Sequence, residues 1–150
     1  MTSASLDVPD EPSCAFCAYI SGTRPYTILA QNSRVAVLVT REQRGVSHLL
    51  VAPIAHCSTI LDIPDGAAEA LMFGIRSAAR LIARTDRCEG IAVWQNNGVP
   101  AGQSIGHVHF HVAGTLPGGG TRWGEVPEIS IAETDVIADR LLAAGPLDLS

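Results

Sequence analysis

The chain has 150 residues, of which 47% are hydrophobic and 17% are charged, so it is long enough and apolar enough to bury the core of one domain. Its formal net charge of -5, without any dense run of basic residues, argues against a protein that binds nucleic-acid backbones by releasing counterions. No stretch approaches the ~20 apolar residues that span a bilayer, and the first residues carry acids and prolines instead of a signal sequence. We therefore expect a cytoplasmic protein that binds neither membranes nor nucleic acids.

The cysteines and the N-terminal residues set two further expectations. In a reducing compartment the four cysteines are more often thiols or metal ligands than disulfides, and two of them form the pair Cys14-Ala15-Phe16-Cys17. Residues 1–13 are rich in Ser, Asp and Pro, so we expect a disordered tail followed by a single domain over residues 14–150. A short helix is predicted over Cys14–Ser21, because apolar residues fall at helical spacing and Gly22 supplies a stop.

Three strands are predicted next. Tyr26–Ala30 and Arg34–Val39 are apolar runs separated by Asn and Ser, which favour a turn, so they predict a hairpin. A third strand is predicted over His48–Ala52, because Pro53 has no N–H with which to continue a strand pairing.

The second half of the chain predicts a long helix, two strands and a last helix. Pro64-Asp65 is a typical helix start, and an apolar stripe continues from it to about Arg84. Ile91–Trp94 and His107–Val112 are predicted strands, and a capping box predicts a helix over Ser130–Leu142. Because strands and helices do not alternate regularly, we expect an α+β fold with an antiparallel sheet of about five strands, a long helix and a C-terminal helix.

Three of the five histidines occupy every second position, as His107, His109 and His111. In a strand this period of two places the three imidazoles on one face and the apolar residues between them on the other. His107 and His111 would then lie roughly 13 Å apart and could not both bind one metal ion. The pattern indicates divided roles, with a metal at one end and an anionic substrate further along; the alternative is a solvent-facing strand with incidental histidines.

The loop Gly102–Ser104 lies just upstream of the histidines and offers flexible backbone, an amide and a hydroxyl. These are neutral groups that can donate to a phosphate oxygen without the help of a lysine. An imidazole, whose ordinary pKa is ~6.5, can act as a nucleophile, a hydrogen-bond donor or a proton carrier at neutral pH. Together these residues indicate chemistry at a phosphoryl group.

Four segments between about Cys14 and Gly114 carry a family pattern when they are taken together. They are Cys14-x-x-Cys17, Ser47–His56 (SHLLVAPIAH), Asn96-Asn97-Gly98 and Gly102–Val112 (GQSIGHVHFHV). On these segments the chain resembles the histidine triad (HIT) family, and within it the zinc-containing bacterial relatives of the Hint-type nucleoside phosphoramidases. The segments occur in the family's order, and the last of them is highly specific.

The resemblance implies a mechanism and the residues that perform it. The middle histidine of the triad, here His109, would attack the α-phosphorus and form a nucleotidyl-histidine intermediate that water or another acceptor resolves. It also implies that Ser104 bonds a phosphate oxygen or the leaving group, and that His111 binds a phosphoryl oxygen. Asn96 and Gln103 are implied to position the nucleotide.

The resemblance further implies a structural zinc ion. Carried over residue by residue, its ligands are Cys14, Cys17, His56 and His107, a set of two sulfurs and two nitrogens that suits tetrahedral zinc. The alternative for the cysteine pair is two small buried hydrophobic side chains in a helix. Cys57 is a possible competing ligand.

The chain departs from the family pattern at several positions. The acid that usually follows the second strand and binds ribose is missing, and Val39 is followed by Thr and Arg. Gly106 replaces a bulkier residue and is expected to open space beside His107. Trp123 is a candidate to reach toward the active site of a partner in the expected homodimer; alternatively, it fastens its own loop. His48 is expected to be structural.

The function implied by the resemblance is that of a nucleotide hydrolase or transferase that cleaves at the α-phosphorus of a nucleoside phosphoramidate or an acyl-nucleotide. One alternative within the same superfamily is a dinucleoside polyphosphate hydrolase, which differs in its leaving group. Another is a nucleotide-binding regulatory protein that has lost turnover.

Overall fold

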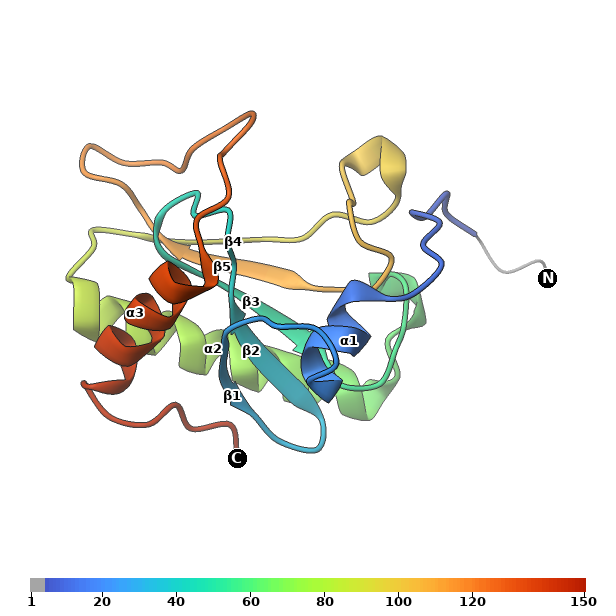
Figure 1. The fold of residues 1–150 in the computed structure, drawn as a ribbon, viewed down its shortest axis with the longest axis horizontal. Coiled ribbons are helices and arrows are strands. Elements are labelled where there is room, and N and C mark those ends of the chain that lie inside the picture. Colours follow the sequence, from blue (N-terminus) through green and yellow to red (C-terminus); the bar gives the residue numbers. More distant parts are fainter. Residues whose placement is uncertain (1–4) are drawn as a thin grey trace.

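A computed structural model describes residues 5–150, in which five strands form one antiparallel sheet with the order β1-β2-β3-β5-β4 (Figure 1). The strands are β1 (Ile28–Gln31), β2 (Val35–Val39), β3 (Val46–Pro53), β4 (Ile91–Trp94) and β5 (Phe110–Gly114). The helices are α1 (Ala15–Ser21), α2 (Asp65–Asp86) and α3 (Ile131–Leu142), with short 3-10 turns at Ile60–Asp62 and Val99–Ala101. The predicted α+β fold, with its long helix and C-terminal helix, is confirmed.

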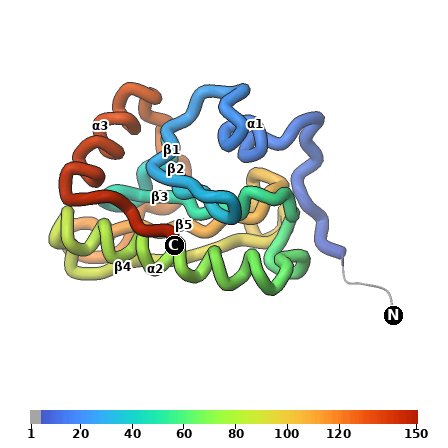
Figure 2. The backbone as a smooth tube through the Cα atoms, turned by 90° about the horizontal axis from the view of Figure 1, so that it is seen from below, coloured from blue at the N-terminus to red at the C-terminus, as the bar shows by residue number. Residues whose placement is uncertain are grey.

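The helices cover the two faces of the sheet, as Figure 2 shows with α1 above and α2 below. Strand β2 is buried along its whole length, so its side chains alternate between two apolar layers. Its valines pack with α2 and α3, whereas Ala36 and Leu38 pack with Phe16 of α1. The apolar cluster on the α1 side has fewer buried residues than the other, and the rings of His107 and His109 lie against Phe16 there.

Local signals explain where the helices begin and end. Helix α1 begins after Cys14, whose sulfur accepts from the N–H of Cys17, and ends at Gly22, whose φ of 79° is disfavoured for other residues. The predicted capping box of α3 is confirmed, since Ser130 and Glu133 each accept from the other's backbone N–H.

The predicted strand over His107–Val112 is wrong at its start, because β5 begins only at Phe110. Phe110 pairs with Val51, so Val108, two positions further along the ladder, would oppose Pro53, which has no N–H to donate. The N–H of Val108 donates instead to the carbonyl of Cys57 at 2.8 Å. His107 therefore stands before the strand, while the boundaries of the other predicted elements agree to within two residues.

The N-terminal segment lies along the body of the domain. The carbonyl of Asp7 accepts from the N–H of Val99 at 2.6 Å, and a carboxylate oxygen of Glu11 accepts from the N–H of Gly106 at 3.1 Å. Residues 1–4, where the expected tail begins, lie outside the described residues. Within residues 5–150, no helix combines the length and the apolar character needed to cross a membrane.

Candidate active site and metal centre

The hydrogen bonds of His109 determine which of its nitrogens is available. Its Nδ1 lies 2.7 Å from the carbonyl oxygen of His107, and a carbonyl can only accept, so Nδ1 carries the proton. The ring is 8% exposed, and burial lowers its pKa, which keeps the imidazole neutral at pH 7. The remaining nitrogen, Nε2, therefore holds a lone pair.

A second chain of hydrogen bonds sets the protonation of His111. The backbone N–H of Arg44 donates to Nδ1 of His48 at 3.1 Å, so the proton of a neutral His48 ring is on Nε2. That Nε2 lies 2.9 Å from Nδ1 of His111 and donates to it, which leaves the proton of a neutral His111 on its own Nε2. His111 thus presents a donor, whereas its neighbour His109 presents a lone pair.

Burial keeps these rings neutral. It is the main cause that lowers the pKa of His48 to about 4 and that of His111 to about 2. Neighbouring histidines and the positive charge of Arg44 lower the pKa of His111 further. The indole ring of Trp94 stacks on His111 with ring centroids 4.8 Å apart and planes 4° apart, which fixes the orientation of the imidazole.

Two hollows meet at the histidines. The larger hollow, about 490 Å³, is lined by Trp94, Arg44 and Arg122 among others, and the smaller, about 170 Å³, by the rings of Phe16, Tyr19 and Tyr26. Four residues line both hollows: Glu42, Ser104, His109 and His111. The two histidines and Ser104, which the sequence singled out for catalysis, therefore lie together at one wall.

The two residues expected to position the nucleotide also line the larger hollow. The amide of Asn96 donates to the carbonyl of Ala101 at 2.8 Å. Gln103 is buried, and its amide bonds the backbone of Gly98, Ser58 and Ile105. Gln103 thus holds the loop that presents Ser104, and a direct contact of either amide with a nucleotide stays a prediction.

The four expected metal ligands form one cluster, the only group of three or more such side chains found within residues 5–150. Their ligand atoms all lie within 4.8 Å of one another: Cys14, Cys17, His56 and His107. Nδ1 of His107 lies 3.3 Å and 3.6 Å from the two sulfurs and 3.2 Å from Nδ1 of His56. The other nitrogen of His107 donates to the carbonyl of Pro53 at 2.8 Å, so Nδ1 is the one with the lone pair.

These distances fit a tetrahedral metal ion. Bonds of about 2.0–2.1 Å to nitrogen and about 2.3 Å to sulfur place two nitrogens ~3.3 Å apart, and a nitrogen and a sulfur ~3.6 Å apart. The fourth short distance, from Cys17 to His56, is 3.6 Å. Burial and the neighbouring Cys14 raise the pKa of the Cys17 thiol to about 11, so this thiol needs a cation beside it to ionise at neutral pH. The four residues can therefore hold one metal ion.

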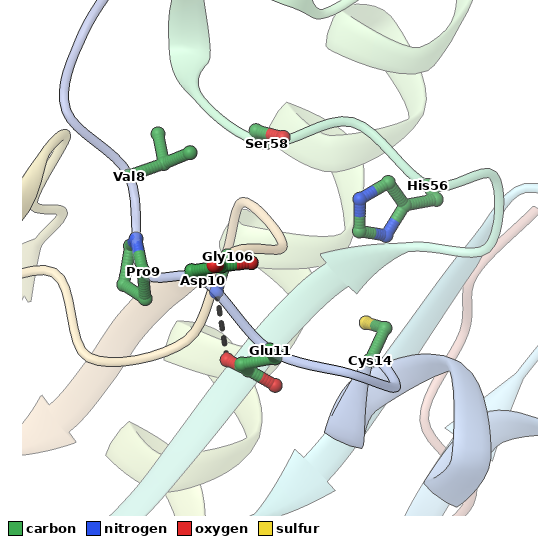
Figure 3. Close-up of a pocket in the computed structure, with 8 residues that line it drawn as sticks. All are labelled: Val8, Pro9, Asp10, Glu11, Cys14, His56, Ser58 and Gly106. Atoms are coloured by element: carbon green, nitrogen blue, oxygen red, sulfur yellow. Dashed lines mark hydrogen bonds between the residues drawn. The ribbon is translucent and has the colours of Figure 1, made fainter.

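A hollow of about 150 Å³ lies beside this cluster, and Figure 3 shows Cys14 and His56 at its wall. The N-terminal segment forms its other side, with the bond from Gly106 to Glu11 drawn as a dashed line (Figure 3). The space expected at Gly106 is occupied, because a Cβ there would lie 2.9 Å from the carbonyl oxygen of Pro9. Cys57 is not a member of the cluster.

Several residues at the larger hollow have no counterpart among the sequence predictions. Glu42 is an acid that faces both hollows, although the acid expected directly after the second strand is missing. Arg44 and Arg122 line the same hollow from loops distant in sequence. Trp123, which the sequence did single out, also lines the larger hollow; it is 90% exposed, so it does not fasten its own loop. Nothing local in the sequence brings Arg44 and Arg122 together, because they lie 78 residues apart on different loops.

Comparisons with known proteins agree with this geometry. The model of the HIT domain family matches residues 21–117. An uncharacterised HIT-like protein of Methanocaldococcus jannaschii is 28% identical over 122 residues, which are 80% of this chain and 94% of that protein. An adenosine 5'-monophosphoramidase of Saccharomyces cerevisiae is 30% identical over 114 residues, 75% of this chain and 70% of the relative. The crystal structure of a Zn-bound histidine triad family protein of Mycobacterium smegmatis matches with a TM-score of 0.71 at 25% identity, covering 88% of this chain and 94% of that one.

Proposed function

The chain belongs to the HIT domain family, and on that premise we propose that it is a nucleotide hydrolase or transferase that cleaves its substrate at the α-phosphorus with His109 as the nucleophile. The observation that carries the proposal is the hydrogen bond from Nδ1 of His109 to the carbonyl of His107. It leaves Nε2 as an unprotonated nitrogen in a buried imidazole at the meeting point of two hollows.

The reaction proceeds in two displacements. Nε2 of His109 forms a bond to phosphorus while the bond from phosphorus to the leaving group breaks; the leaving group departs with the electron pair, and an amine takes up a proton from solvent as it departs. Water or another acceptor then forms a bond to the phosphorus of the nucleotidyl-histidine and loses its proton to solvent, while the bond from phosphorus to Nε2 breaks and returns its electron pair to the imidazole. The Nε2–H of His111 and the hydroxyl of Ser104 donate to phosphoryl oxygens, whose negative charge grows in the transition state.

We propose zinc as the metal at the cluster, held by Cys14, Cys17, His56 and His107. A closed set of two sulfurs and two nitrogens is the combination that structural zinc prefers. Because the ligands come from the start of α1, the loop after β3 and the segment before β5, the ion would fasten these three parts together. It would also hold His107, whose carbonyl orients His109.

The substrates that we propose are nucleoside phosphoramidates and acyl-nucleotides. The yeast relative named an adenosine 5'-monophosphoramidase supports the phosphoramidates. Dinucleoside polyphosphates are the alternative, and they would use the same nucleophile with a different leaving group.

We also propose a homodimer, since β4 is an edge strand and its Val93 is half exposed.

The proposal is tested by incubating the protein with adenosine 5'-phosphoramidate, an aminoacyl-adenylate and diadenosine tetraphosphate. We expect turnover by the wild type and none by His109→Ala, and a short incubation followed by mass spectrometry should detect a nucleotidyl adduct on His109. Bound nucleotide without turnover of any substrate would favour the regulatory binding protein. An adduct on another residue would overturn the mechanism.

A further inference from the structure

The second displacement of the proposed reaction needs a group that takes up a proton. A water molecule becomes more acidic as it bonds to phosphorus, and a base placed beside it speeds this step by accepting the proton. Nε2 of His109 is bonded to phosphorus at that stage, so it is not free to act as this base. The wall that the two hollows share contains three other residues: Glu42, Ser104 and His111.

His111 and Ser104 are not suited to take this proton. Nδ1 of His111 accepts from Nε2 of His48 at 2.9 Å, and the other nitrogen of the neutral His111 ring carries its own proton. Burial lowers the pKa of His111 to about 2, so the ring does not bind a second proton at neutral pH. The hydroxyl of Ser104 donates to a phosphoryl oxygen in the proposed reaction, and a serine needs a base of its own before it can take a proton from water.

Glu42 is the one acid that both hollows reach among the described residues. No other acid lines the larger hollow. The smaller hollow has a second acid, Glu128, but this residue pairs with Arg41 at 3.1 Å and does not line the larger hollow. Because attacking and leaving atoms lie roughly in line at phosphorus, the water enters from the side that the leaving group has vacated. Glu42 faces that water whichever of the two hollows held the leaving group.

The backbone of Glu42 is fixed, whereas its carboxylate is open to water. Its N–H donates to the hydroxyl of Thr40 at 3.2 Å, just after the end of β2. Its Oε2 lies 3.6 Å from Nη2 of Arg44, and half of the side chain is exposed. Within residues 5–150, no hydrogen bond occupies Oε1. This oxygen can therefore accept from a water molecule, and the exposed side chain can return the proton to solvent.

We propose that Glu42 is the base of the second displacement, an inference that rests on the proposed function. The oxygen of water forms a bond to phosphorus while one of its O–H bonds breaks and the proton passes to the Glu42 carboxylate. The bond from phosphorus to Nε2 of His109 breaks, and its electron pair returns to the imidazole. Glu42 then passes the proton to solvent. The first displacement does not use Glu42, because His109 attacks with a nitrogen that carries no proton.

Quenched-flow mass spectrometry with adenosine 5'-phosphoramidate measures the formation and the breakdown of the nucleotidyl adduct on His109 separately. Glu42→Gln keeps the size of the side chain but removes the base. We expect its adduct to form at a rate within about twofold of the wild type and to break down about a hundredfold more slowly, so that the adduct accumulates. The control is Glu69→Gln, which should leave both rates unchanged, because Glu69 is an exposed residue of α2 that lines neither hollow.

Added azide tests whether the function lost in Glu42→Gln is that of a base. Azide attacks phosphorus with a lone pair and has no proton to lose, so it needs no base. We expect azide to restore rapid breakdown of the adduct in this variant and to be found bonded to the phosphorus of the released nucleotide. Slow breakdown that azide does not change would mean that Glu42 only shapes the site, and it would overturn the inference.

The other outcomes separate this inference from the proposed function. A wild type that forms and hydrolyses the adduct, with unchanged breakdown in Glu42→Gln, overturns the inference and leaves the proposed function standing. Slower formation of the adduct with unchanged breakdown also overturns it, since Glu42 would then bind the substrate. A wild type that cleaves no substrate and forms no adduct overturns the proposed function, and this inference with it.

Discussion

Nε2 of His48 donates a hydrogen bond to Nδ1 of His111 over 2.9 Å, and this contact decides which nitrogen of His111 faces the substrate. His48 itself is oriented by the backbone N–H of Arg44, so a loop controls the protonation of a ring on the neighbouring strand. His48 is therefore a positioning residue. It lines neither hollow, but the hydrogen bond that it donates to His111 keeps the proton of His111 on Nε2, at the wall that the two hollows share.

The role of His48 predicts different effects for two amide substitutions. Gln places its amide nitrogen close to the position of Nε2, whereas Asn places it close to Nδ1, so only His48→Gln keeps the donor to His111. We expect kcat to fall about tenfold in His48→Asn, the cost of one hydrogen bond in the transition state, and less in His48→Gln. Steady-state kinetics with adenosine 5'-phosphoramidate measure both. Equal losses in the two variants would show that His48 acts through packing alone.

Acid should destabilise the fold through the same residue. Burial lowers the pKa of His48 to about 4 in the folded state, whereas an unfolded histidine has a pKa of ~6.5. Above pH ~6.5 His48 is unprotonated in both the folded and the unfolded state, so it does not change the stability. As the pH falls toward 4, the unfolded state binds a proton on His48 that the folded state does not bind, and this lowers the free energy of unfolding. His48 alone should remove about 3 kcal/mol of the free energy of unfolding by pH ~4.

Urea unfolding between pH 7.5 and pH 4 measures this loss. The variant His48→Gln supplies the control, because it carries no titrating group at this position and should show a shallower slope over the same range. His111, with a pKa lowered to about 2, contributes in both proteins. Parallel curves for wild type and variant would mean that His48 binds its proton equally well in both states.

The sequence alone was sufficient for much of the fold but for less of the site. Alternation in β2, the apolar stripe of α2 and the capping box of α3 are local signals, and local interactions largely determine those elements. The late start of β5 depends on Pro53, a residue of another strand, so no pattern within 107–112 could reveal it. The pairing of Arg44 with Arg122 likewise arises from two loops that meet only in the folded chain.

Removing one sulfur should release the metal and loosen the fold. We expect protein purified without added zinc to contain about one equivalent, and Cys17→Ser to contain much less, with a lower Tm. Cys88→Ser is the matched control, because Cys88 is a free cysteine outside the cluster. Elemental analysis and thermal unfolding give both quantities. Less than about half an equivalent in the wild type would contradict the four-ligand site.

A methyl group at Gly106 should displace the N-terminal segment. Its Cβ would lie 2.9 Å from the carbonyl oxygen of Pro9, closer than backbone atoms tolerate. In Gly106→Ala we expect faster proteolytic cleavage within residues 5–12 and faster loss of metal to a chelator, since this segment forms one side of the hollow beside the cluster. Gly66→Ala is the control, because a Cβ at Gly66 meets no atom within 4 Å. Identical cleavage rates in the two variants would show that Gly106 is not needed to keep the N-terminal segment in place beside the cluster.

Arg140 of α3 should stabilise the bend in β3 that precedes His48. Its guanidinium donates to the hydroxyl of Ser47 at 2.7 Å and pairs with the carboxylate of Asp86, whose side chain is only 6% exposed. Ser47 has a φ of 55°, a conformation that costs a residue with a Cβ about 1 kcal/mol and that this bond helps to hold.

Replacing Arg140 by Met removes both bonds and leaves the Asp86 carboxylate without its partner. We expect Arg140→Met to lower the free energy of unfolding by about 1–3 kcal/mol and Arg140→Lys, which keeps the charge, by less. Ser47→Gly should change it little, because glycine loses the hydroxyl but adopts a positive φ freely. If urea unfolding gives Arg140→Met the same stability as the wild type, the ion pair and the bond to Ser47 do not hold the bend.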